Sequence, residues 1–341
     1  MTQTTSTGLS TGTIPDIDAT EGFDWHRLAL WAREQYPLYI LLILLVIAVF
    51  STEAFFTSRN LTNLVLQVSV IGIVTLAQFL VVLTGGIDIS VGSVVGLAGV
   101  LSTGLFLGAS VPVAILVAVL VGAAIGAING YLIAFRGLEA FIVTLGMLAL
   151  ARGLVYAFTE GVPVIPTADN FRGIATSTVL GFPVIGILWI GLALILAFVV
   201  RRTVFGRRIY AVGSNQEAAR ASGVPVKTTL LGVYILAGAL TGFAGFLLAS
   251  RVGVGTPTAG NLYELDAIAA VVIGGTSLVG GKGRVFGAVV GTLIFAVITN
   301  LLVLLNVSTY LQDAFRGALI LVAVFLTTVQ FAKRKKVTKL L

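Results

Sequence analysis

Long apolar stretches recur along the chain, and they constrain its fold more than any other feature. A helix needs about 20 apolar residues to cross the hydrocarbon core of a bilayer. The sequence predicts an all-α polytopic membrane protein with about ten transmembrane helices, at residues 37–52, 61–83, 88–108, 111–134, 139–158, 181–200, 227–250, 263–280, 285–304 and 310–331. The eighth of these stretches carries charges at one end and a glycine pair near the other, so nine or eleven crossings also fit the sequence.

The composition agrees with a membrane location and excludes most kinds of catalytic site. Apolar residues make up 57% of the chain and charged residues 10%, and the mean hydropathy is +1.07, which is more apolar surface than one soluble core can bury. The chain has no cysteine, and its single histidine, His26, lies in a polar N-terminal segment. These counts exclude disulfides, thiolate metal sites and cysteine or histidine catalysis within the membrane, so we expect a chain that is not an enzyme.

The positions of the basic residues predict the orientation of the chain. Cytoplasmic loops of membrane proteins are enriched in Lys and Arg, and we take the net charge of +7 as a sign of orientation and not of nucleic-acid binding. With the N-terminus inside and ten crossings, three loop arginines fall outside, namely Arg59, Arg172 and Arg251. Both termini are therefore expected in the cytoplasm, together with Arg27, Arg33, Arg136, Arg201, Arg202, Arg207, Arg208, Arg220, Lys227, Lys282, Arg284, Lys333, Arg334, Lys335, Lys336 and Lys339.

Two polar tails flank the apolar part of the chain, and one long internal loop interrupts it. Residues 1–36 are expected to form a disordered cytoplasmic tail, residues 37–332 the transmembrane domain, and residues 333–341 a basic cytoplasmic tail. The longest internal loop, 201–226, is basic and contains signals for a helix of about two turns. Asn215 can cap its start, and Gly223 can end it just before Pro225.

Glycine accounts for 40 of the 341 residues and predicts close packing between helices. Small residues four apart occur in several stretches, for example at Gly122/Gly126 and Gly238/Gly242. Two further clusters have paired glycines beside hydroxyl groups, which is typical of a helix that breaks to line a polar pathway. A tight cytoplasmic hairpin is the alternative for both clusters, whose residues include Gly85, Gly86, Gly274, Gly275 and Thr276.

Polar and charged residues in the apolar stretches are candidates for a translocation pathway. Burying them in hydrocarbon costs several kcal/mol, so each needs a partner or a function. Asp313 and Arg316 can pair with each other on one helix, whereas Arg152 has no evident local partner. The other candidates could contact an uncharged polyhydroxy solute or simply tie helices together, and they are Asn63, Gln67, Asp88, Glu264 and Asp266.

Three motifs resemble a known family. The segments Thr84-Gly-Gly-Ile-Asp-Ile-Ser-Val-Gly92, Arg208–Gly223 and Tyr263–Gly283 occur in the same order in the ribose/xylose-type permease subunits of bacterial ABC importers. The resemblance covers about residues 38–331. It implies a monosaccharide permease of the bacterial inner membrane, which forms the pathway with a second permease subunit, expected to be a second copy of the chain. It also implies cytoplasmic ATP-binding subunits that hold ATP-Mg and a periplasmic sugar-binding protein, with no cofactor in this chain.

The internal loop also resembles the coupling helix of ABC importers. Glu217-Ala-Ala219 is followed by a glycine four residues later, and the resemblance implies that this segment contacts the ATPase through Glu217, Ala218, Ala219, Arg220 and Gly223. An ion-coupled secondary transporter of a small polar solute is the main alternative, and a passive channel is a third. The sequence does not identify the sugar.

Overall fold

The computed structural model describes residues 35–104, 110–166 and 168–338, so most of the expected N-terminal tail, the end of the third apolar stretch and the last three residues of the chain lie outside the described residues. The regular structure of the described part is helical apart from a small antiparallel sheet, β1 (Thr178–Val179) and β2 (Phe182–Pro183). The helices are α2 (Tyr36–Ser51), α3 (Ser58–Leu83), α4 (Val91–Gly104), α5 (Val111–Arg136), α6 (Ala140–Thr159), α7 (Gly173–Thr176), α8 (Val184–Arg202), α9 (Val204–Ser214), α10 (Gln216–Ala221), α11 (Val226–Val252), α12 (Tyr263–Ile273), α13 (Val285–Leu304) and α14 (Thr309–Thr338).

Within the described residues, six helices are long and apolar enough to cross a membrane: α3, α5, α6, α8, α11 and α13. Helices α2 and α4 are apolar but shorter. The predicted eighth span, 263–280, is not one helix: α12 ends at Ile273, next to the glycine pair where the sequence predicts a break or a hairpin. The backbone then turns at Gly275, whose φ of 87° is a left-handed conformation that favours glycine.

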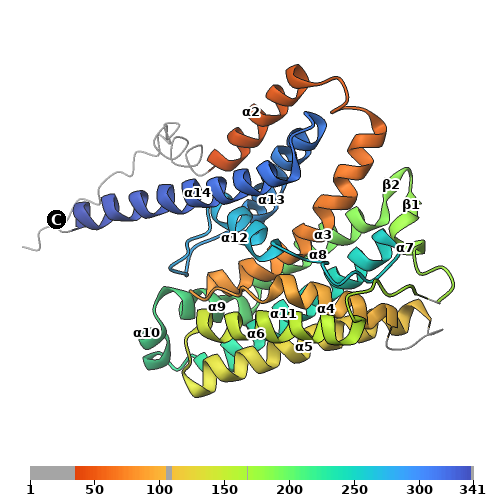
Figure 1. Cartoon of the computed structure of the whole chain (residues 1–341). Coiled ribbons are helices and arrows are strands. Elements are labelled where there is room, and N and C mark those ends of the chain that lie inside the picture. The colour runs from red at the N-terminus through yellow and green to blue at the C-terminus, as the bar shows by residue number, and fades with distance from the viewer. Residues whose placement is uncertain (1–34, 105–109, 167, 339–341) are drawn as a thin grey trace, which may run out of the picture. The chain divides into compact units, whose positions relative to one another are not determined.

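Glycine contacts join the central helices, as the spacing of small residues predicts. Helix α11 packs along α5, α4 and α3, and Figure 1 shows α4, α5, α6 and α11 side by side. A Cβ on Gly122 of α5 would overlap the carbonyl oxygen of Gly238 on α11, and one on Gly242 would overlap the carbonyl oxygen of Ala118. Helix α3 lies at the centre, because its last 16 residues, Val68–Leu83, are all buried.

Apolar side chains cover the outer faces of several helices. Helix α8 exposes Leu194 and Phe198, and α5 exposes Leu116 and Leu120, each by more than half of its surface. Such exposure is unfavourable in water but suits a surface that contacts lipid. Together with the six candidate spans, it makes the protein a multi-pass membrane protein.

Polar side chains hold two of the non-helical segments between the helices. The first, 84–90, joins α3 to α4 without helical structure, and Gly85 has a φ of 83°. The second, 253–262, joins α11 to α12. Arg152 of α6 holds the second segment, because its guanidinium donates to the carbonyls of Pro257 at 2.8 Å and Ala259 at 3.0 Å. These backbone carbonyls, remote in sequence, are the partners of Arg152 that the local sequence does not reveal.

Candidate functional site

Helix α10 forms as its local sequence predicts. The Asn215 side chain accepts hydrogen bonds from the backbone N–H groups of Glu217 at 2.9 Å and Ala218 at 3.0 Å, which caps the start of the helix. At the other end the N–H of Gly223 donates to Arg220 and the N–H of Val224 donates to Ala219. Gly223 has a φ of 79°, so this is the left-handed turn that commonly ends helices.

One side of α10 is anchored and the other is exposed. Ala219 is buried and clusters with Ala134, Val212, Val226 and Leu230 from α5, α9 and α11. Glu217, Ala218 and Arg220 are exposed, and Arg220 lines an open groove of about 270 Å³ together with residues 224–228. The helix therefore presents charged groups outward while a small side chain fixes it to the bundle.

The two glycine clusters of the sequence meet next to the end of α9. The Gly281 N–H donates to the Leu83 carbonyl at 2.9 Å, and a Cβ on Gly280 would lie 2.7 Å from the Gly85 nitrogen and 2.8 Å from the Gly213 carbonyl oxygen. We call this contact of Gly85, Gly213, Gly280 and Gly281 the glycine junction. It links the ends of α3 and α9 with the turn after α12, and only residues without a side chain allow so close an approach.

Tyr210 ties α9 to the same turn. Its hydroxyl donates to the Gly283 carbonyl at 2.8 Å. Burial raises the pKa of Tyr210, and the nearby Arg284 opposes this effect. The phenol therefore stays protonated and keeps donating at neutral pH.

Asp88 stabilises the first non-helical segment from within. Its carboxylate accepts from the Ser90 N–H at 2.8 Å and the Ser90 hydroxyl at 2.6 Å, and Asn129 of α5 donates to that hydroxyl at 3.2 Å. Gln78 of α3 bonds the backbone of Asp88 when its amide is turned so that both of its polar atoms have partners. Its nitrogen then donates to the Asp88 carbonyl at 2.9 Å, and its oxygen accepts from the Asp88 N–H at 3.3 Å. Such a network fixes an extended backbone that has no helical hydrogen bonds of its own.

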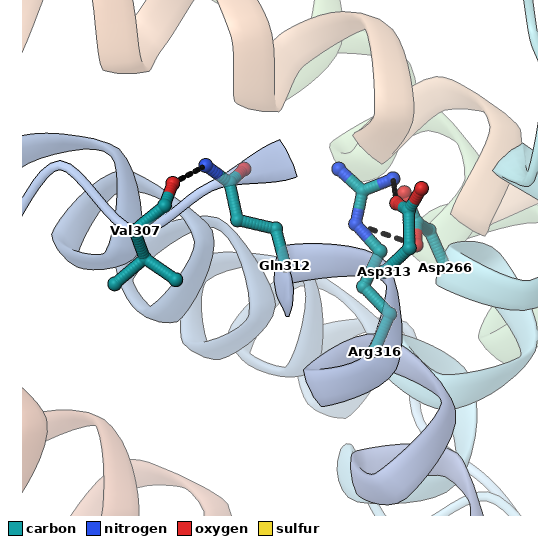
Figure 2. Close-up of polar contacts among 5 residues, drawn as sticks. All are labelled: Asp266, Val307, Gln312, Asp313 and Arg316. Atoms are coloured by element: carbon teal, nitrogen blue, oxygen red, sulfur yellow. Dashed lines mark hydrogen bonds and ion pairs between the residues drawn. The ribbon is translucent and has the colours of Figure 1, made fainter. Parts of the chain in front are cut away.

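Glu264 and Asp266 lie in the first turn of α12, as expected, but point to different neighbours. Glu264 lies close to Gly92 at the start of α4, where a Cβ would overlap its carboxylate. Asp266 faces Arg316 of α14, with 3.9 Å between its Oδ1 and the arginine Nε. Figure 2 shows that Arg316 also reaches Asp313, at 3.5 Å, so the expected pair within α14 is confirmed.

The structure does not bring the predicted pathway residues to one place. Gly85 lies beside the turn after α12, where a Cβ would be 3.0 Å from the Val279 carbonyl oxygen, and Gly86 lies beside the Tyr234 hydroxyl. Asp88 bonds Ser90, whereas Gly274 packs against Gly287 of α13. Gln67 and Asp266 instead line a small cavity together. Asn63 is exposed and is not among the cavity residues. Gln78 and Asn129 are not among the predicted pathway residues, and the signal that could point to them is a polar side chain within an apolar stretch.

Comparison with known proteins places the chain in a transport family. Residues 60–324 match the family described as branched-chain amino acid transport system / permease component. The ribose import permease protein of Bacillus subtilis (strain 168) is 42% identical over 293 residues, which cover 85% of this chain and 91% of that protein. The D-allose and xylose transport system permease proteins of Escherichia coli (strain K12) are 39% and 36% identical over 91% and 84% of this chain, and 95% and 89% of their own lengths. No solved structure matches the chain. The chain therefore belongs to this family of membrane transport permeases, whose members in this comparison are transport subunits and not enzymes.

Proposed function

We propose that this chain is the permease subunit of an ATP-driven ABC importer that carries a monosaccharide across the bacterial inner membrane. The observation that carries the proposal is the identity of 36–42% to permeases named for ribose, allose and xylose, over at least 84% of the chain. The three sugars named are all monosaccharides, which makes a small neutral polyhydroxy solute the expected cargo.

The proposed partners follow from this class of importer. Cytoplasmic subunits bind ATP-Mg, a periplasmic protein delivers the sugar, and two copies of this chain form the pathway between them. The exposed residues Glu217, Ala218 and Arg220 would face the ATPase, with Ala219 and Gly223 fixing the position of α10. ATP binding would then move α10, and its contact with the bundle would switch the pathway between its two openings.

We further propose ten crossings with both termini in the cytoplasm. Six candidate spans are long enough alone, and α2, α4 and α14 would supply three more. Residues 253–273, a non-helical segment followed by α12, would make the remaining crossing, since irregular backbone is tolerated in a membrane where protein surrounds it. The sorting of 16 loop Lys and Arg residues to the inside and three to the outside supports this orientation.

Thiol labelling tests the orientation, because the chain has no cysteine of its own. Ser177 and Ser222 are both exposed and differ from cysteine by a single atom. In intact cells an impermeant thiol reagent should label Ser177→Cys and leave Ser222→Cys unlabelled until the membrane is permeabilised. Labelling of Ser222→Cys from outside would overturn the proposed topology.

Transport in reconstituted vesicles tests the function. The permease, its ATPase and its binding protein would be reconstituted, and uptake of radiolabelled D-ribose, D-xylose and D-allose measured. We expect uptake of at least one sugar that requires ATP and falls to background without the binding protein. Uptake that follows a sodium or proton gradient without ATP would instead support the secondary transporter, which the buried Asp266–Arg316 pair would suit.

A further inference from the structure

A small polar cavity lies between four helices of the bundle. Its volume is about 40 Å³, and Gln67 of α3, Tyr263 and Asp266 of α12, Thr299 of α13 and Arg316 of α14 line it. Gln67 is nine residues from the start of α3, about 14 Å along the helix axis, so the cavity lies well inside the bundle. Asp266 is only 5% exposed. We call this space the Asp266 cavity.

Two buried polar atoms in this cavity lack a hydrogen-bond partner among the described residues. They are Oδ1 of Asp266 and Nε of Arg316, which face each other across 3.9 Å. This distance is too long for a hydrogen bond, and a buried polar atom left without one is destabilising. The second contact of Arg316, to the exposed Asp313, leaves Nε free to point at Asp266 (Figure 2). The geometry therefore leaves a place for a group that can bond both atoms.

A hydroxyl group satisfies both atoms at once. Its oxygen can lie about 2.9 Å from each, accept a hydrogen bond from Nε–H and donate its own proton to Oδ1. A metal cation would be repelled by the Arg316 guanidinium, and an anion would be repelled by the Asp266 and Asp313 carboxylates beside it. The chemistry of the cavity thus favours a neutral ligand that both donates and accepts.

The other walls of the cavity have the same character. The Gln67 amide and the Thr299 hydroxyl each donate and accept, and the rings of Tyr263 and Phe295 offer apolar faces. Neighbouring hydroxyls on one edge of a sugar and the C–H groups of its ring match such a mixture. A cavity of 40 Å³ holds a single hydroxyl or water, so a whole sugar requires the helices around it to separate.

We propose that the Asp266 cavity is a binding site for the hydroxyl groups of the transported monosaccharide, occupied when α12 and α14 move apart during transport. The inference rests on the proposed function. It gives the Asp266–Arg316 pair a role in solute binding rather than in packing alone. Helix α12 lies between two non-helical segments, 253–262 and 274–284, which are places where the backbone can bend.

Protection of introduced cysteines tests the proposal directly. Gln67→Cys and Thr299→Cys would be reacted with a small methanethiosulfonate reagent in the reconstituted importer, with and without saturating D-ribose, D-xylose or D-allose. We expect one of these sugars to slow labelling at both positions at least fivefold, while glycine betaine at equal osmolarity has no effect. The control is Asn63→Cys, four residues from Gln67 on the same helix and outside the cavity, whose labelling should not change.

Charge removal gives a second readout. Asp266→Asn keeps the shape of the side chain, and we expect it to lower sugar uptake at least tenfold while ATP hydrolysis stimulated by the binding protein persists. Asp313→Asn also removes a carboxylate beside Arg316, but an exposed one, and should change uptake by less than about twofold.

Equal labelling with and without sugar would contradict the proposal and mean that the cavity holds only water. Normal sugar uptake by Asp266→Asn would contradict it as well. Uptake by the parent in the same vesicles separates this result from a failure of the proposed function. If the parent imports sugar with ATP while sugar protects neither cysteine, the proposed importer function is supported and the proposed sugar site is wrong. If Asp266→Asn does not insert, cysteine protection alone decides.

Discussion

Replacing Gly223 with valine should reduce ATP-driven uptake at least tenfold while the permease remains inserted in the membrane. Gly223 has a φ of 79°, a conformation that costs other residues about 1–2 kcal/mol and β-branched residues more. Apart from its neighbours in the chain, no atom of the described residues lies within 4 Å of the position that a Cβ would take, so the effect would come from the backbone and not from a collision. Relief of the strain would require the turn after α10 to change.

That change should affect coupling more than stability. The turn directs the chain from α10 through Pro225 into α11, and it keeps Ala219 packed against Val212 and Leu230. A different turn would reorient the exposed Glu217 and Arg220, which are the side chains proposed to meet the ATPase. Because these residues are exposed, their movement costs the permease little stability of its own.

The measurement is ATP hydrolysis and sugar uptake by the same reconstituted complex, together with the amount of ATPase that co-purifies. Glu217→Lys, which reverses a charge on the same helix, should give the same loss. Gly137→Val is the matched control, because Gly137 has a φ of 71° and lies outside α10, and the described residues other than its chain neighbours leave its Cβ position open to 4 Å. Gly223→Asn should retain most activity, since asparagine tolerates the left-handed region. If Gly223→Val transports like the parent, the segment is an ordinary surface turn.

Local signals in the sequence were sufficient for the helices whose ends depend on nearby residues. The start and end of α10 followed from Asn215, Gly223 and Pro225, all within eleven residues. The long apolar helices followed from hydropathy, because solvation by lipid depends on composition more than on the identity of any one neighbour. These features need no knowledge of the rest of the chain.

Contacts between distant parts of the chain could not be predicted in this way. The sequence left Arg152 without a partner because its two carbonyl acceptors are 105 and 107 residues away, in a segment whose lack of helix is itself a tertiary feature. Asp266 meets Arg316 on another helix, and the paired glycines predicted close approach without identifying the partner. The glycine junction is the clearest case, since three separate segments form it.

Replacing Gly274 with valine should disrupt the contact between α12 and α13. Gly274 has a φ of −68°, which any residue adopts, so the constraint here is contact and not backbone strain. A Cβ would overlap the backbone carbonyl of Gly287, and a Cβ on Gly287 would overlap the carbonyl of Gly274. Backbone cannot turn aside as a flexible side chain can, so the two helices would have to separate.

We expect Gly274→Val to lower uptake at least tenfold and to lower the thermal unfolding midpoint of the purified permease by about 3 °C or more, since overpacking of a tight contact costs about 1–3 kcal/mol. Gly146→Val is the control, because Gly146 lies within α6 and, beyond that helix's own backbone, the described part of the chain places no atom within 4 Å of its Cβ position. It should change uptake by less than about twofold. The two substitutions add the same side chain inside or beside an apolar helix, so a difference between them reports the backbone contact alone. Equal behaviour would mean that α12 and α13 do not approach as closely as Gly274 and Gly287 indicate.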